Sequence, residues 1–140
     1  MQNTTTVAIA LLFVSGGQAI AQGCQYSSYN HNGSQMRAER CADALRIHYE
    51  NPKASIAKLG VKSGTLLFDG FVTLSNGIEF IEGQARVFKA GCGPAEFRVE
   101  GGYTNDTGRI PPPIYLAGVA PVRAANCSKK SSRNETLDFN

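Results

Sequence analysis

The chain has 140 residues, of which 42% are hydrophobic and 9% aromatic, and it is long enough for one domain with a modest core. Its 14 basic and 11 acidic side chains give a formal net charge of +3, and no dense basic stretch occurs. Nucleic-acid-binding proteins need a concentrated basic surface, so this pattern argues against that class. We therefore expect no nucleic-acid partner.

The N-terminus carries the features of a cleavable export signal. Residues 7–14 (VAIALLFV) are an unbroken apolar run, and Ala19-Ile20-Ala21 follows with the small residues that signal peptidases accept. The run is much shorter than the ~20 apolar residues of a membrane-spanning helix, and no later stretch approaches that length. We predict that residues 1–21 are removed, that the mature chain begins at Gln22, and that the product is periplasmic or secreted with no membrane span.

Four cysteines remain after this cleavage, and an even number in a small exported domain is typical of disulfides. They are Cys24, Cys41, Cys92 and Cys127. Zinc sites place their ligands in close pairs such as C-x-x-C, whereas these cysteines lie far apart and neither histidine stands near them in a ligand pattern. The sequence therefore predicts up to two disulfides, in any of three pairings, and no metal.

The first elements are expected to be an irregular lead and a helix. Residues 22–34 are polar and turn-rich without a periodic pattern, which predicts a lead without regular structure. Ser34 can cap a helix, and apolar side chains recur at helical spacing through residues 36–49 until a proline ends the pattern. This predicts one N-terminal helix with Cys41 on its buried face, followed at residues 53–64 by a short helical turn or a loop.

From residue 65 onward, short runs rich in Val, Phe, Tyr and Leu alternate with Gly, Asn and Asp, as in strands and hairpins. Turn residues follow the first run at Ser75-Asn76-Gly77 and the third at residues 105–108. We predict five antiparallel strands, at residues 65–71, 78–88, 95–100, 114–123 and 136–139.

These elements predict a mainly β fold with one N-terminal helix and disulfide bonds. The strands would form a small sheet or partly closed barrel that the helix covers on one face, with a two-layer sandwich as the alternative. The lead and helix would occupy residues 22–63 and the β-domain residues 64–140, together one globular unit.

An internal repeat bears on the cysteine pairing. The unit G-x-A-x-V-x-x-A-x-C of residues 83–92 recurs with the same spacing at residues 118–127. If the repeat is structural, the second and fourth predicted strands run in the same direction and leave their cysteines at the same end of the sheet. This favours a bond between Cys92 and Cys127, with the two N-terminal cysteines bonded to each other; the rival pairing joins one of those cysteines to the sheet.

No residue pattern after the signal marks a catalytic site. The sequence contains no nucleophile elbow, phosphate loop, dinucleotide fingerprint or paired-histidine metal motif. His31 lies in the turn-rich lead, and His48 on the predicted helix is typical of a partly buried packing residue. We therefore expect no enzyme activity, no cofactor and no functional requirement for either histidine.

Aromatic and proline residues are the candidates for a binding surface. Four tyrosines could contribute to it, with burial beside the sheet as the alternative for each: Tyr26, Tyr29, Tyr103 and Tyr115. The run Pro111-Pro112-Pro113 is compatible with a polyproline helix that docks on an aromatic groove, or simply with the delimiting of a strand.

A family resemblance rests on the β-rich half of the chain. Its motifs are GTLLFDG at residues 64–70, GQARVF at 83–88, CGP at 92–94, VEG at 99–101, LAG at 116–118, APVR at 120–123, Cys127 and LDF at 137–139. With these the chain resembles the nodulation formation efficiency C family of small exported rhizobial proteins. The resemblance implies a bacterial, periplasmic or secreted protein that affects how well the bacterium nodulates a legume, and it carries no catalytic residue.

The expected function is a non-enzymatic binding or interaction protein of the bacterial envelope or medium, with an unknown protein or glycan ligand. The alternatives are an inhibitor of a secreted hydrolase, which needs an exposed loop with a protruding acidic or aromatic residue, and an enzyme of unrecognised type. A polar cleft around a perturbed carboxylate or His48 would favour the enzyme, whereas a flat aromatic patch would favour the binding protein.

Overall fold

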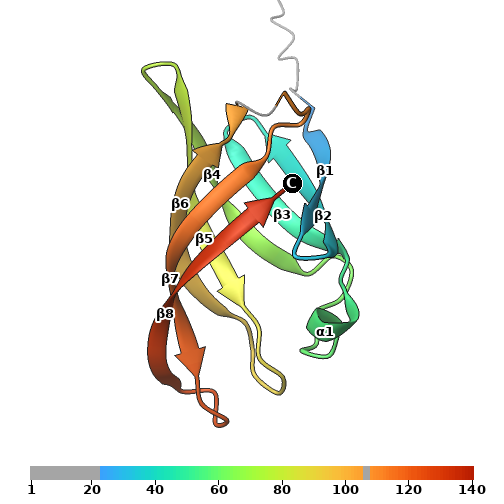
Figure 1. Cartoon of the computed structure of the whole chain (residues 1–140), viewed down its shortest axis with the longest axis vertical. Helices are drawn as coiled ribbons and strands as arrows, with labels where there is room; N and C mark the ends of the chain where they lie inside the picture. Colours follow the sequence, from blue (N-terminus) through green and yellow to red (C-terminus); the bar gives the residue numbers. More distant parts are fainter. Residues whose placement is uncertain (1–22, 106–107) are drawn as a thin grey trace, which may run out of the picture.

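The computed structural model describes residues 23–105 and 108–140, which contain eight antiparallel strands in one sheet (Figure 1). Each strand pairs with the next one along the chain. The strands are β1 (Gln25–His31), β2 (Ser34–Cys41), β3 (Ala44–Asn51), β4 (Leu66–Ser75), β5 (Ile78–Val87), β6 (Ala95–Tyr103), β7 (Ile114–Arg123) and β8 (Lys129–Phe139). A short helix, α1 (Ala54–Ala57), lies between β3 and β4.

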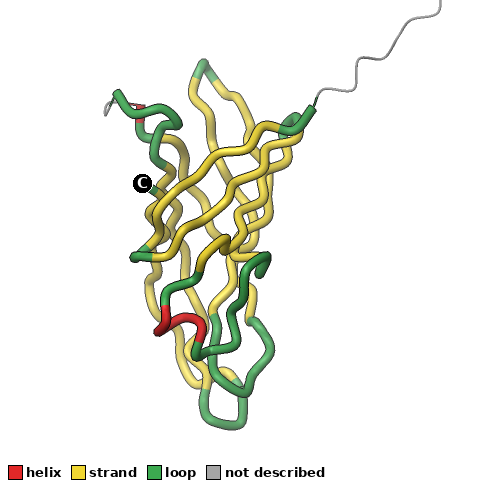
Figure 2. Tube along the Cα trace, turned by 90° about the vertical axis from the view of Figure 1, so that its right-hand side faces the viewer, coloured by secondary structure: helices red, strands yellow, loops and turns green. Residues whose placement is uncertain are grey.

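The sheet curls until its two edge strands meet, but it does not close into a continuous ladder. Asn30 in β1 and Asn140 after β8 exchange backbone hydrogen bonds of 2.6 and 3.0 Å, although β1 and β8 are not paired as neighbours in the sheet. Figure 2 shows strands on both sides of the molecule, with α1 and its flanking loops towards one end. The curled sheet therefore has an inner face and an outer face.

The hydrophobic core lies on the inner face, where strand residues largely alternate between buried and exposed positions. Leu67 and Phe68 are neighbours and both buried, at the irregularity between β3 and β4. Burying each such side chain contributes roughly 1.5–3 kcal/mol. The largest fully buried side chains are Phe68, Phe139, Met36, Leu45, Ile47, Leu67, Ile81, Ile114 and Leu116.

Inward-facing glycines let neighbouring strands approach closely where the sheet bends. A Cβ atom on Gly101 would lie 1.9 Å from the carbonyl oxygen of Tyr115, and one on Gly118 would lie 2.1 Å from that of Arg98. Gly70 and Gly83 face each other in the same way across β4 and β5. Only glycine permits these approaches, so these glycines allow the sheet to curve at these positions.

The predicted helix over residues 36–49 is wrong, because that segment forms β2 and β3. Met36 and Ala38 point inward from β2, and Leu45 and Ile47 point inward from β3. Two runs of period two, joined by a tight turn in which Ala42 has a φ of +56°, imitate helical spacing. The only helix described, α1, falls instead within the segment predicted to be a helical turn or a loop.

The prediction of an irregular lead is also wrong, since residues 25–31 form β1 and join the same sheet as the predicted β-domain. The connection to β2 is a two-residue turn in which Asn32 and Gly33 have φ values of +50° and +85°. Ser34 caps no helix; it is buried, and its Oγ accepts a hydrogen bond of 3.0 Å from the backbone N–H of Lys53.

The five predicted strands correspond to β4 to β8, three of which are longer than predicted, so the expected count of five is replaced by eight. The turn predicted between the first two is present, with Asn76 and Gly77 at φ values of +51° and +77°. The predicted signal peptide and part of the turn at residues 105–108 lie outside the described residues.

The predicted disulfide pairing is confirmed. Cys92 bonds Cys127 with a Cα–Cα distance of 5.5 Å, and Cys24 bonds Cys41 with a Cα–Cα distance of 4.3 Å. Since β5 and β7 both run antiparallel to β6, they run in the same direction, as the repeat predicts. Arg123 at the end of β7 adds a hydrogen bond of 3.1 Å to the Val87 carbonyl at the end of β5, which strengthens this end of the sheet.

Candidate functional site

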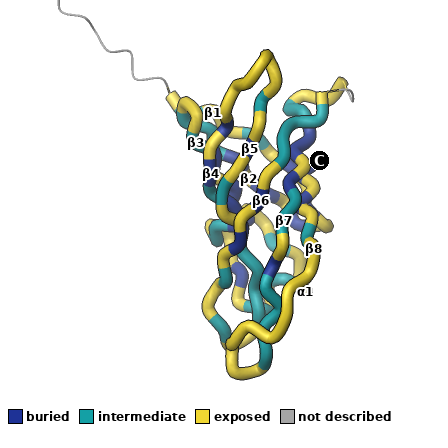
Figure 3. Tube along the Cα trace, turned by 90° about the vertical axis from the view of Figure 1, so that its left-hand side faces the viewer, coloured by how far each residue is buried: buried dark blue, intermediate teal, exposed yellow. Residues whose placement is uncertain are grey.

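Large apolar side chains are exposed on the outer face of β4, β5 and β7. In the register of the sheet, Phe80 is opposite Gly102, and Gly102 is opposite Tyr115. Phe80 is 49% exposed and Tyr115 46% exposed. In Figure 3, where exposed residues are yellow, exposed residues make up most of the projecting β4–β5 hairpin. The exposed apolar side chains of this face are Phe71, Ile78, Phe80, Tyr115 and Val119.

A groove of about 930 Å³, here called the outer groove, runs across this face. Its lining includes Phe80, Glu82, Glu100, Gly102, Ala117 and Val119. Gly102 has no side chain and Ala117 only a methyl group, so the surface is hollow between the larger residues. The volume lies in the range of roughly 300–1,000 Å³ that is typical of ligand sites.

Two acidic side chains lie directly opposite each other in the outer groove. Glu82 on β5 pairs in register with Glu100 on β6. The guanidinium of Arg98 donates to Glu82 at 2.7 Å, whereas within residues 23–105 and 108–140 no salt bridge reaches Glu100. Like charges opposite each other on a sheet are unfavourable, so the groove is suited to a cation beside its apolar walls.

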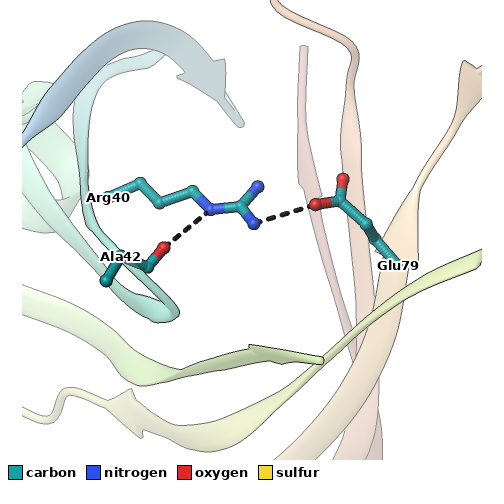
Figure 4. A network of polar contacts seen from close by, with 3 residues as sticks. All are labelled: Arg40, Ala42 and Glu79. Atoms are coloured by element: carbon teal, nitrogen blue, oxygen red, sulfur yellow. Dashed lines mark hydrogen bonds and ion pairs between the residues drawn. The ribbon is translucent and has the colours of Figure 1, made fainter. Parts of the chain in front are cut away.

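A second candidate, here called the mouth cavity, opens on the inner face near the Cys24–Cys41 bridge and has a volume of about 240 Å³. Figure 4 shows the side chain of Arg40 on β2 pointing towards Glu79 of β5. Its Nη2 donates to Glu79 Oε1 at 2.8 Å, and its Nε donates to the Ala42 carbonyl at 3.3 Å. The lining residues are Gln25, Ser27, Tyr29, Ala38, Arg40, Leu45, Glu79, Tyr103, Pro111, Pro112 and Ile114.

The electrostatics of the mouth cavity keep Arg40 charged and the tyrosines neutral. Burial is the largest single influence on Arg40 and lowers its pKa, but Glu79 and Tyr103 together outweigh burial through hydrogen bonds and charge, so the pKa of Arg40 is raised. Burial raises the pKa of Tyr29 to about 12 and also raises that of Tyr103. The Tyr29 hydroxyl donates to the Pro112 carbonyl at 3.2 Å. At neutral pH the cavity therefore presents the Arg40 cation, bonded to Glu79, and neutral tyrosine hydroxyl groups.

The structure places the two histidines away from both candidate sites. His31 is buried at the end of β1, where its Nδ1–H donates to the Asp138 carbonyl at 2.9 Å, and burial lowers its pKa. His48 lies half-buried on the outer face of β3, opposite Arg37 in register; burial lowers its pKa, and the nearby arginines act in the same direction although Glu39 opposes them.

A shallow polar pocket of about 380 Å³ includes His48 and Glu39. The hydroxyl of Tyr26 already donates to Glu39 at 3.2 Å, and within the described part of the chain no hydrogen bond orients the His48 ring. A general base is normally held by a second group, so this pocket lacks the arrangement of a catalytic dyad.

The tyrosines divide between the surface and the interior. Tyr26 is 55% exposed and lies under the guanidinium of Arg37, whose Cζ is 4.4 Å from the ring centroid, and Tyr115 is exposed beside the outer groove. Tyr29 is buried, and Tyr103 is partly buried in the mouth cavity. The proline run packs at this mouth immediately before β7, so it does not project as a free polyproline segment.

One group of side chains has the spacing of metal ligands. The ligand atoms of Cys24, Glu39 and Cys41 lie within 4.8 Å of one another. Both sulfur atoms belong to a disulfide, however, and only a thiolate is a metal ligand of this kind.

Sequence reasoning named Tyr29, Tyr103 and Tyr115 but missed Phe80, Glu100 and the Arg40–Glu79 pair. The alternation of inward and outward positions along β5 and β6 would have placed Phe80 and Glu100 outside. The ion pair had no such signal, because its members are 39 positions apart and belong to strands that are not neighbours in the sheet.

Comparison of the chain with protein-family models, with curated proteins and with solved structures finds no match. In residues 23–105 and 108–140, no helix has the length and apolar character needed to cross a membrane.

Proposed function

We propose that the protein is an exported, non-enzymatic interaction module that binds a partner protein through the outer groove. The observation that carries this proposal is the row of exposed apolar side chains that borders the groove, centred on Phe80 and Tyr115. Soluble proteins rarely expose contiguous apolar surface without a binding role, and aromatic residues are enriched in protein interfaces.

The charges of the groove indicate the chemistry of the partner. Glu100 is available for a cation, and no lysine or arginine lines the groove. A partner that presents a Lys or Arg side chain next to an apolar one would match both the charge and the apolar surface. The two disulfides support export, because such bonds persist in oxidising compartments.

Site-specific photo-crosslinking in the source bacterium tests this proposal. A benzophenone amino acid in place of Phe80, or in place of Val119, should give the same covalent adduct with one envelope or secreted protein. The control position is Ser28, which is exposed on the outer face of β1. Adducts of equal yield at all three positions, or none at the groove, would contradict the proposal.

The purified partner then allows a quantitative test. Glu100→Lys should weaken binding at least tenfold, because it reverses the charge that faces the cation of the partner. Ser28→Lys also introduces a lysine, on β1 and outside the groove lining, and should leave the dissociation constant unchanged. Equal affinities for both variants would show that the groove is not the interface.

The β4–β5 hairpin favours inhibition of a secreted hydrolase as a second candidate function. The hairpin projects from the sheet (Figure 1), and Leu74 and Ile78, which flank its turn, are 73% and 59% exposed. Apolar residues on a rigid hairpin suit insertion into an enzyme cleft. If so, the mature protein inhibits at least one lysozyme, protease or glycosidase in a panel, and Leu74→Ser with Ile78→Ser relieves that inhibition.

The resemblance to rhizobial proteins leads to a proposal at the level of the organism, which is that the protein affects nodulation efficiency. A rhizobial strain without the protein should form fewer nodules on its legume than the parent strain, and expression of the wild-type chain should restore the number. Unchanged nodule counts would contradict this role.

A further inference from the structure

The mouth cavity contains a charged pair where the inner face is otherwise mostly apolar. Arg40 and Glu79 occupy inward positions, and their neighbours in the cavity include the buried side chains of Ala38, Leu45 and Ile114. The side chains of the pair are 31% and 38% exposed, so the pair stands at the opening and remains accessible to a ligand. Charged groups rarely face a core, and an apolar pair there would be about equally stable.

The pair retains unused hydrogen-bonding capacity. A guanidinium has five N–H donors, and Arg40 uses Nε for Ala42 and Nη2 for Glu79. Its side chain also interacts with the Tyr103 hydroxyl. Glu79 accepts the Arg40 bond with Oε1, and within the described residues no hydrogen bond reaches its Oε2. The cavity therefore offers a free donor and a free acceptor side by side.

This combination selects a neutral ligand with adjacent donor and acceptor groups. A charged ligand would be attracted by one member of the Arg40–Glu79 pair and repelled by the other, so a net charge on the ligand adds little binding affinity. A hydroxyl group both donates and accepts, and two neighbouring hydroxyls can bind the guanidinium and the carboxylate together. We propose that the mouth cavity binds a single neutral sugar ring through two adjacent hydroxyl groups.

The size and the walls of the cavity match such a ring. A volume of 240 Å³ corresponds to about eight water molecules at ~30 Å³ each. It lies just below the roughly 300–1,000 Å³ typical of ligand sites, so it suits a ligand no larger than a single ring. Tyr29, Tyr103 and Pro111 provide apolar surfaces for the C–H groups of the ring, while Gln25 and Ser27 add polar groups at the opening. The ring is either a free monosaccharide or the terminal residue of a glycan.

Titration of the oxidised mature protein with sugars, followed by ¹H–¹⁵N NMR, tests the inference. Glucose, galactose, mannose and N-acetylglucosamine are the neutral probes, and glucuronic acid and glucosamine are the charged controls. At least one neutral sugar should give saturable shifts, with a dissociation constant in the millimolar range, at the amides of Arg40 and Glu79. The charged controls should bind more weakly.

Two double variants provide a matched comparison. Arg40→Gln with Glu79→Gln removes the ion pair of the mouth and should weaken sugar binding at least tenfold. Arg98→Gln with Glu82→Gln removes an ion pair of similar length, 2.7 Å against 2.8 Å, from the outer face and should leave sugar binding unchanged. Tyr103→Phe, which deletes only a hydroxyl, should weaken binding as well and serves if the first double variant unfolds.

The outcomes separate the possibilities. Binding of both free sugars and methyl glycosides indicates a terminal glycan residue, and binding of free sugars alone indicates a monosaccharide; either result supports the inference. No saturable shift with any neutral sugar, tighter binding of glucuronic acid, or full binding by the Arg40 and Glu79 variant would overturn it. Glu79 and Tyr103 line both sites, whereas Glu100 lines the outer groove and not the mouth cavity. The role of the groove as an interface is therefore tested separately, with Glu100→Lys.

Discussion

At the scale of single residues, alanine substitutions of Gly118 and Gly93 test whether close strand approach depends on glycine. A Cβ atom on Gly118 would meet the Arg98 carbonyl at 2.1 Å, whereas one on Gly93 has no atom within 4 Å. Gly118→Ala should therefore lower the free energy of unfolding by roughly 1–3 kcal/mol or more, as overpacking does. Gly93→Ala should change it little. Urea denaturation measures both, and equal stabilities would contradict the close approach of β6 and β7.

His31 should make stability depend on pH. Burial lowers its pKa below 6.5, so the unfolded chain binds a proton at a higher pH than the folded one. The contribution of His31 to the free energy of unfolding should therefore be complete above about pH 6.5. It should be lost as the pH drops from there towards the pKa of His31 in the folded protein. His31→Gln should flatten this dependence in denaturation curves recorded from pH 8 to pH 5.

His48→Gln is the matched control, because His48 is only half-buried and its pKa is lowered in the same direction. It should flatten the pH dependence less than His31→Gln does. We also expect His48→Gln to retain binding of the partner, since the residue lies outside the outer groove and the mouth cavity. A larger effect of His48 on the pH dependence would contradict the burial assigned to the two residues.

At the scale of elements, the repeat explains how the Cys92–Cys127 bond joins two strands that are not neighbours. The loops after β5 and β7 extend beyond the same end of the sheet, and Arg123 of β7 hydrogen-bonds the carbonyl groups of Val87 and Gly93. Both features follow from two strands that run in the same direction on either side of β6.

Removal of the Cys92–Cys127 bond should lower the stability of the fold. It closes a loop with a sequence separation of 35, for which the chain-entropy model gives about 4 kcal/mol, against about 3 kcal/mol for the separation of 17 between Cys24 and Cys41. Cys92→Ser with Cys127→Ser should therefore lower the free energy of unfolding more than Cys24→Ser with Cys41→Ser. Guanidinium denaturation without reductant tests this order, and the reverse order would show that strain or residual structure dominates.

At the scale of the whole molecule, the export signal predicts the N-terminus of the mature chain. Ala19 and Ala21 stand where a signal peptidase would cut, so the mature protein should begin at Gln22 and carry both disulfides. Mass spectrometry of the exported protein under non-reducing conditions checks both points. Retention of Met1, or cleavage several residues away, would contradict the predicted site.

Both candidate sites are also properties of the whole molecule. The outer groove combines residues of the five strands β4 to β8, and the mouth cavity combines residues of β1, β2, β3, β5, β6, β7 and the loop before β7. Neither set is contiguous in sequence, which is why residue patterns alone led to the tyrosines but not to Arg40, Glu79 or Glu100.

The sequence by itself determined the β-rich half of this protein and its disulfides. Stretches of β5, β6 and β8 alternate, turn residues follow β4, and the repeat predicts the shared direction of β5 and β7, so local pattern located the strands from β4 to β8. Three of them extend further than the pattern indicated. The tertiary structure alone decided that residues 25–51 form strands, because the spacing from Met36 to Tyr49 fits a helix as well as two strands. Pairing of β3 with β4 selects the strands, since only then do Leu45 and Ile47 reach the common core. The curl of the sheet, set by its inward glycines, brings Arg40 to Glu79, and no local pattern encodes that contact.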